Sequence, residues 1–143
     1  MTSGADNHNL VVGFTCGAFD LLHPGHIHLI KEASNQCDHL IVGLHTDPTI
    51  DRPHKNKPVQ TTFERYMQLE ALSDVDSIVP YDTEADLFNL LGTLNIHKRF
   101  IGSDYFHKTF TGEDLCQERN IKVVFIPRMH TWSSSSLRER LTR

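Results

Sequence analysis

The chain has little of what marks disulfide-stapled, membrane-spanning or secreted proteins. Its three cysteines, Cys16, Cys37 and Cys116, lie far apart and form no CxxC pair, which fits small core residues in a reducing compartment. No window approaches the roughly 18 apolar residues of a membrane span. The polar N-terminus also lacks the apolar segment of a secretory signal. These absences predict a cytoplasmic protein without a membrane partner.

Positive charge is scarce as well. The chain has 14 Lys and Arg residues against 18 Asp and Glu residues, and its formal net charge is −4. It also lacks a continuous basic stripe with interleaved aromatic residues, so nucleic acid is not an expected partner, although a local anion site is compatible with this charge. At 143 residues the chain is most simply one compact domain. We expect a disordered tail at residues 1–9 and the domain at residues 10–143.

Strand-like apolar runs alternate with helical patterns along the chain. The runs predict strands at residues 10–16, 39–45, 77–81, 98–102 and 121–127. Helices are expected to begin near Pro24, Thr61, Thr83, Glu113 and Ser133, whereas residues 46–58 are polar and predict an exposed loop. This alternation predicts an α/β fold, a single Rossmann-like domain with about five parallel strands and helices on both faces of the sheet.

The unusual chemistry of the sequence follows the predicted strands. In a parallel α/β sheet, ligands bind at the carboxyl ends of the strands where the strand order reverses. The turn after the first strand, the loop after the second, GSDYF after the fourth and RMHTWSSSS after the fifth should meet at that edge. We therefore expect the functional site there.

The stretch GAFDLLHPGH suggests an anion site at the start of the first helix. Gly17 allows a sharp turn, and the helix that follows directs unpaired N–H groups and its positive dipole end toward that turn. His23 and His26 are one helical turn apart and could both donate hydrogen bonds to a phosphate, which Gly25 would let approach the backbone. The alternatives are a metal site or two capped surface histidines, and a turn or capping role for Asp20. His28 is expected to point elsewhere.

Four ordered motifs resemble the HxGH nucleotidyltransferase superfamily, and within it the cytidylyltransferase-like group that includes glycerol-3-phosphate cytidylyltransferase. GAFDLLHPGH is similar to the signature GTFDLLHxGH, and TDP at residues 46–48 is similar to a TD segment after the second strand. IGSDYF is similar to a GxDW/Y segment, and RMHTWSSSSL to RTEGISTTxI. The resemblance covers nearly the whole chain.

The resemblance implies transfer of CMP from CTP to a phosphate monoester, most simply glycerol 3-phosphate, with release of pyrophosphate. An adenylyltransferase that uses ATP and a sugar phosphate is the alternative within the superfamily, and a non-catalytic nucleotide-binding module is the alternative outside it. Mg²⁺ is expected to arrive with the nucleotide and to need few protein ligands. The resemblance also implies a homodimer.

The same resemblance assigns roles to particular residues. The residues expected to act on the phosphates are His23, His26, Lys55, Lys57 and Arg128. The residues expected to bind the nucleotide are Cys16, Gly17, Ala18, Phe19, Asp20, Gly25, Arg65, Gly102, Asp104, Tyr105, Ser133, Ser134 and Ser135. Several have simpler alternatives: solvated loop lysines, a surface ion pair for Arg65, a core position for Tyr105 and a helix cap for the serines.

The chain departs from the motifs at a few positions. Ala18 replaces a Thr or Ser, and Met129 replaces the Thr of RTEG. His130 replaces its acidic residue, and the bulky Trp132 follows. These changes lie beside the HxGH histidines without replacing them, so they bear on the choice of acceptor more than on the class of reaction.

Overall fold

The computed structural model describes residues 10–106, 108–128 and 132–142 and shows one five-stranded, all-parallel sheet. The strands are β1 (Val12–Gly17), β2 (His39–His45), β3 (Ser77–Tyr81), β4 (Lys98–Gly102) and β5 (Lys122–Ile126), in the order β3-β2-β1-β4-β5. The predicted fold class is confirmed: β2, β3 and β4 have the predicted bounds, and the ends of β1 and β5 differ from prediction by one or two residues. The expected tail at residues 1–9 lies outside the described residues.

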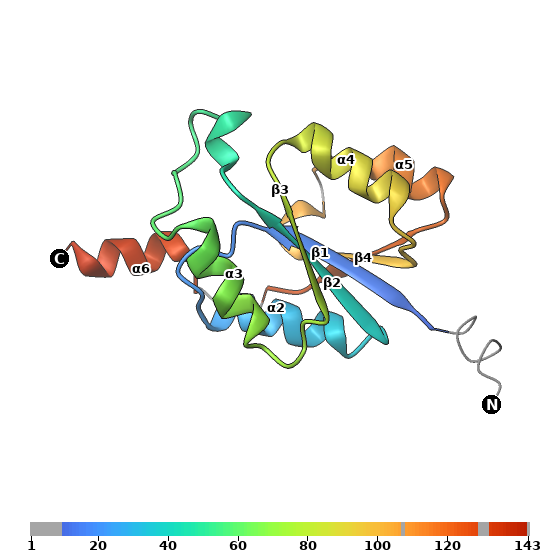
Figure 1. Cartoon of the computed structure of the whole chain (residues 1–143), viewed down its shortest axis with the longest axis horizontal. Coiled ribbons are helices and arrows are strands. Elements are labelled where there is room, and N and C mark those ends of the chain that lie inside the picture. Colours follow the sequence, from blue (N-terminus) through green and yellow to red (C-terminus); the bar gives the residue numbers. More distant parts are fainter. Residues whose placement is uncertain (1–9, 107, 129–131, 143) are drawn as a thin grey trace.

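Helices cover both faces of the sheet (Figure 1). Helices α2 (Pro24–Ser34) and α3 (Thr62–Glu70) lie on one face, and α4 (Glu84–Thr93) and α5 (Glu113–Glu118) lie on the other. Helix α6 (Ser134–Leu141) extends beyond the sheet toward the C-terminus. Two 3₁₀ turns, η1 (Pro48–Ile50) and η2 (Ser103–Tyr105), were not predicted. Within the described residues, no helix is long and apolar enough to cross a membrane.

Side-chain caps explain where three of the helices begin. Thr61 accepts a hydrogen bond from the Glu64 N–H, and the Glu64 side chain accepts one from the Thr61 N–H, as the sequence predicts. Thr83 begins α4 in the same way. Helix α2 has a less common cap, because the imidazole of His23 takes the place of the usual hydroxyl or carboxylate.

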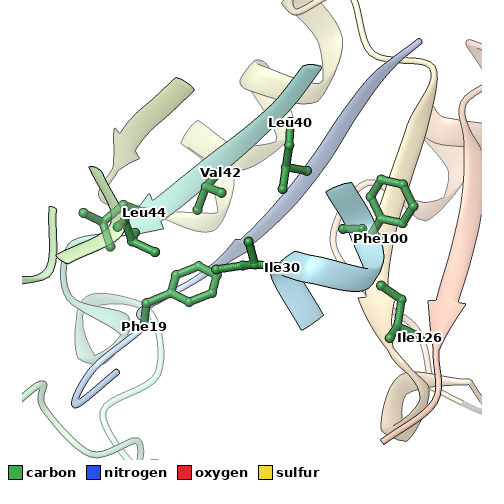
Figure 2. Close-up of a cluster of buried hydrophobic side chains, with 9 residues drawn as sticks. Phe19, Ile30, Leu40, Val42, Leu44, Phe100 and Ile126 are labelled. Carbon is green, nitrogen blue, oxygen red and sulfur yellow. The ribbon is translucent and has the colours of Figure 1, made fainter. Parts of the chain in front are cut away.

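Two apolar clusters hold the helices against the sheet. Figure 2 shows Phe19 and Ile30 beside one another on the side of the sheet that carries Val42 and Leu44. The opposite face packs Phe14 against residues of α4 and α5. The start of α2 is therefore fixed by core packing along the rest of the helix.

The strand order reverses at β1, which pairs with β2 on one side and β4 on the other. The chain leaves β1 for the α2 and α3 face, and it leaves β4 for the α4 and α5 face. Diverging connections open a crevice at the carboxyl ends of these two strands.

Replacing Ile30 with Ala should lower the free energy of unfolding by about 2–5 kcal/mol, because its side chain is fully buried and would leave a cavity. Urea unfolding measures this change. Ile27→Ala on the same helix is the matched control, since Ile27 is 39% exposed and should lose far less. Equal losses would show that α2 is not anchored through Ile30.

Candidate active site

A cavity of about 460 Å³ opens at the carboxyl edge of the sheet. It is lined by segments from β1, α2, β4, β5 and the start of α6, as the topology predicts. The predicted site residues among its lining are Cys16, Gly17, His23, Gly25, His26, Gly102, Asp104, Tyr105, Arg128, Ser133 and Ser134. Three of the four sequence motifs, those after β1, β4 and β5, thus contribute to one cavity.

His23 and His26 form a stacked pair at the start of α2. Their ring centroids are 3.8 Å apart. The Gly25 N–H donates to His23 Nδ1 at 3.0 Å, and the His23 N–H donates to His26 Nδ1 at 3.4 Å. A neutral imidazole whose Nδ1 accepts must carry its proton on Nε2. The backbone of α2 therefore sets both rings in the tautomer whose Nε2 is a hydrogen-bond donor.

The pKa of His26 is lowered from 6.5 to about 3, chiefly because the ring is buried; the neighbouring His23 contributes to the shift and Asp20 opposes it. His26 is thus neutral at physiological pH. The Nε2–H of the neutral imidazole can donate a hydrogen bond to a phosphate oxygen, and the arrival of negative charge beside the ring would favour its protonation.

The turn between β1 and α2 contains unusual backbone. Phe19 and Leu21, which flank Asp20, have φ angles of 50° and 52°, in the left-handed region that residues other than glycine seldom adopt. Such strain persists only where surrounding contacts enforce it. Here the Leu21 N–H donates to the Gln60 side chain at 2.8 Å, and Phe19 is buried in the core.

Asp20 connects this turn to two distant segments. Its carboxylate accepts hydrogen bonds from the Val59 and Gln60 N–H groups at 2.8 and 2.9 Å, and it pairs with Arg138 of α6 at 2.6 Å. Burial tends to raise the pKa of this carboxyl, but the backbone hydrogen bonds and Arg138 outweigh it and hold the pKa below its usual range. Asp20 thus ties the turn to the segment before α3 and to α6, and it does not line the cavity.

The serines at the start of α6 divide their roles. Ser133 caps the helix by accepting from the Ser136 N–H, while the Ser134 hydroxyl donates to the Asp20 carbonyl at 2.6 Å. Both line the cavity, whereas Ser135 does not. The start of α6 is thereby held against the β1–α2 turn.

Arg65 is buried rather than on the surface, so the surface ion pair considered for it is wrong. All five of its N–H donors are used: they bond the carbonyls of Gln60, Ala18, His45 and Thr46 and the hydroxyl of Thr62. It lies outside the cavity lining. Arg65 therefore joins the ends of β1 and β2 to the start of α3.

The opposite wall of the cavity comes from the segments after β4 and β5. Tyr105 is 37% exposed and lines the cavity, so the core position considered for it is wrong. Arg128 donates from its N–H to the Ser103 hydroxyl and from its guanidinium to the Trp132 carbonyl. Trp132 lines the cavity, while Met129 and His130 lie outside the described residues.

Some predicted residues are not brought to the cavity in this structure. These are Ala18, Phe19, Asp20, Lys55, Lys57, Arg65 and Ser135. Lys55 and Lys57 lie exposed on the loop after η1. Conversely, His28 was expected to point elsewhere but lines the cavity, because the lining extends along α2 beyond its first turn.

The cavity also has a lining on the α4 and α5 face of the sheet, and these residues were not predicted from the sequence. His45 and Tyr81 end β2 and β3, Arg99 lies within β4, and Glu84 begins α4. The signal that could have found it was Arg99, a charged residue inside an apolar strand, because charged side chains are rarely fully buried without a partner or a function. Burial also raises the pKa of the nearby Cys16 thiol, and Arg99 only partly opposes this, so Cys16 is not suited to act as a nucleophile.

Comparisons with known proteins identify the family. Residues 14–140 match the family model described as cytidylyltransferase-like. The chain belongs to the cytidylyltransferase-like family. It is a nucleotidyltransferase domain, and the predicted membership of the HxGH nucleotidyltransferase superfamily is confirmed.

The curated relatives are longer proteins. A bifunctional protein HldE from Hyphomonas neptunium is 35% identical over 129 residues, which are 90% of this chain and 26% of the relative. Another from a Caulobacter species is 42% identical over 116 residues, which are 80% of this chain and 24% of the relative. The chain thus spans about a quarter of the length of these relatives.

Solved structures share the fold of this cytidylyltransferase-like domain. A lipopolysaccharide core biosynthesis protein from Thermoplasma volcanium aligns with a TM-score of 0.66 and 25% identity over 87% of this chain and all of that one. A pantoate-beta-alanine ligase from Francisella tularensis aligns with a TM-score of 0.61 and 17% identity over 96% of this chain and 67% of the other, which shows the shared fold alone.

The pH dependence of stability should reflect His26. Since its pKa is about 3 in the folded state and 6.5 as a free side chain, the unfolded state binds the extra proton between these values. The free energy of unfolding should therefore fall below pH 6.5, by as much as about 1.4 kcal/mol per pH unit from this group. Urea unfolding of wild type and His26→Asn from about pH 7.5 to about pH 5 should show a shallower fall in the variant. Parallel profiles would contradict the buried, neutral state of His26.

The Asp20–Arg138 pair should be energetically coupled. Each of Asp20→Asn and Arg138→Gln should destabilise the protein, and the double variant should lose less than the sum, with a coupling of about 1–3 kcal/mol. Thermal or urea unfolding of the four proteins gives this value. Simple additivity would show that α6 is not held to the β1–α2 turn by this pair.

Proposed function

We propose that this domain transfers an adenylyl group from ATP to the phosphate of a phosphorylated sugar and releases pyrophosphate. The observation that supports nucleotidyl transfer most directly is the stacked His23–His26 pair, fixed as Nε2 donors at the helix start that lines the cavity. Nucleotidyl transfer needs donors of this kind around the phosphates.

The reaction does not require the protein to form a covalent bond with the substrate. An anionic oxygen of the acceptor phosphate attacks the α-phosphorus, and the bond from that phosphorus to the oxygen bridging to the β-phosphate breaks. Pyrophosphate leaves with the electron pair, so neither an enzyme nucleophile nor a strong base is required. The protein contributes in-line positioning and donors for the charge that grows on the phosphate oxygens.

Residues on both sides of the cavity are suited to these tasks. The His23 and His26 Nε2–H groups would bind the phosphates and stabilise the transition state, with Gly17 and Gly25 leaving room beside the backbone. Arg128 and the start of α6 at Ser133 would bind the other side of the polyphosphate. Gly102, Asp104 and Tyr105 would form the wall beside the base, because all three line the cavity at the end of β4 and in η2.

Mg²⁺ remains part of this proposal. The described part of the chain has no group of three His, Cys, Asp or Glu side chains that could hold a metal ion. Asp104 is a carboxylate in the cavity lining that could contact a cation carried by the triphosphate. When bound, the cation would neutralise phosphate charge.

The relatives favour ATP and a sugar phosphate over CTP and glycerol 3-phosphate. The two longer relatives are HldE proteins, and the structure with the TM-score of 0.66 belongs to a lipopolysaccharide core biosynthesis protein, a name that points to sugar-containing products. CTP with glycerol 3-phosphate is the second candidate, favoured by the similarity of GAFDLLHPGH to the cytidylyltransferase signature. The phosphate-binding roles of Lys55 and Lys57 and the homodimer stay predictions of the resemblance.

His26→Ala should lower the rate of pyrophosphate release by about 10²–10³-fold, because it removes one transition-state donor. The assay compares ATP with CTP, each with a hexose 1-phosphate, glycerol 3-phosphate or no acceptor, in the presence of Mg²⁺. His39→Gln is the matched control, since His39 lies at the amino end of β2 and bonds Ser77.

Three outcomes are distinct. Release that requires ATP and the sugar phosphate supports the proposal, whereas release that requires CTP and glycerol 3-phosphate replaces its substrates. A protein that binds nucleotide but releases no pyrophosphate with any pair would instead be a non-catalytic nucleotide-binding module.

A further inference from the structure

The cavity extends across β1 to the opposite face of the sheet from the histidine pair. Arg99 pairs in register with Phe14 of β1 and belongs to the α4 and α5 face, as do Cys16 and Tyr81. This half of the cavity is lined by Arg99, His45, Glu84 and Thr111. None of them belongs to the four motifs that resemble the family.

Arg99 is a buried cation with an unused donor. It is only 4% exposed, and its Nε has no hydrogen-bond partner among the described residues. Another nitrogen donates to the Thr111 carbonyl, and the guanidinium lies 4.8 Å from the Phe110 ring centroid. Gly112, whose φ of 83° favours glycine, ends this turn. The Thr111 carbonyl and the Phe110 ring thus hold the guanidinium, while its buried Nε has no hydrogen-bond partner among the described residues.

His45 repeats this pattern at the end of β2. It is 7% exposed, it stacks on Tyr81 with 4.6 Å between ring centroids, and its Nε2 is buried without a hydrogen-bond partner among the described residues. Burying an unpaired polar atom is costly, so two such atoms in one cavity wall indicate that a ligand completes them.

Glu84 supplies acceptors beside these donors. One carboxylate oxygen pairs with Arg52 at 2.6 Å, and the other accepts from the Thr111 hydroxyl at 3.2 Å. Since Arg52 offsets the charge of Glu84, the charge of Arg99 is left to attract an anion. The carboxylate oxygens of Glu84 and the Thr111 hydroxyl are suited to bind the hydroxyl groups of a polyol.

We propose that Arg99 and His45 form the acceptor subsite and select a phosphorylated polyol, with Arg99 and the His45 Nε2 as its polar contacts. The inference rests on the proposed function, since it divides the same cavity into a nucleotide half and an acceptor half. Because the two halves lie on opposite sides of β1, an acceptor held by Arg99 approaches the α-phosphate from the side away from α2. In-line displacement requires the attacking oxygen and the leaving pyrophosphate to lie on opposite sides of the α-phosphorus, and this arrangement of the two halves would allow it.

The test separates binding of the acceptor from binding of the nucleotide. Arg99→Lys keeps the charge but loses the planar fork and its Nε donor, and His45→Asn loses the ring nitrogen. Each should raise the KM for the acceptor about tenfold or more and leave the KM for ATP or CTP within about twofold, because one hydrogen bond to a buried group is lost. Arg119→Lys is the matched control, since Arg119 also bonds backbone carbonyls, those of Leu91 and Leu94, but lies outside the cavity.

A binding measurement keeps the result independent of turnover. The protein is first saturated with α,β-methylene ATP or α,β-methylene CTP, and glucose 1-phosphate or glycerol 3-phosphate is then titrated in a calorimeter. Wild type and Arg119→Lys should bind the acceptor equally well. His45→Asn should bind it about tenfold more weakly. This result supports the subsite even if no pyrophosphate is released, in which case only the proposed function fails. Unchanged acceptor binding and KM in both variants, or a change in the nucleotide values instead, would overturn the inference, as would an absence of any acceptor binding to wild type.

Discussion

The site depends on one buried guanidinium. The five donors of Arg65 bond carbonyls at the ends of β1 and β2 and groups at the start of α3, so three segments that are distant in sequence share one charged centre. A buried cation is tolerated only when its donors are satisfied, which means that these segments cannot separate without a large desolvation cost. This constraint holds the turn from which α2 begins.

The strained turn and the histidine pair follow from that constraint. Phe19 and Leu21 adopt left-handed backbone because Arg65, Gln60 and the carboxylate of Asp20 fix the chain around them. The chain then enters α2 with the His23 ring as its cap, and the cap hydrogen bonds determine the tautomers of both rings. Donors that are already oriented need no reorganisation when charge develops, and this is the main way in which a protein accelerates phosphoryl transfer.

Much of this architecture is readable in the sequence, and the exceptions have physical reasons. Alternating apolar runs and the Thr61 capping box predict the sheet and α3 because both depend on local pattern. The topology then places GAFDLLHPGH, GSDYF and the serine run at one edge. The surface ion pair considered for Arg65 was wrong because four of its five hydrogen-bond partners are backbone carbonyls, which a sequence pattern does not reveal. Arg99 could have been noticed as a charge inside an apolar strand, but the two nitrogens of Arg99 and His45 that lack a partner among the described residues can be recognised only once the strands are packed side by side.

The central claim is that a nucleoside triphosphate binds across the start of α2 with its phosphates on the His23 and His26 Nε2 atoms. The most direct test is a crystal structure of the protein with α,β-methylene ATP, or its CTP counterpart, and Mg²⁺. The account predicts phosphate oxygens within hydrogen-bond distance of both Nε2 atoms and the base against the segment 102–105. A nucleotide bound elsewhere, or bound in this cavity with its phosphates away from both imidazoles, would contradict it.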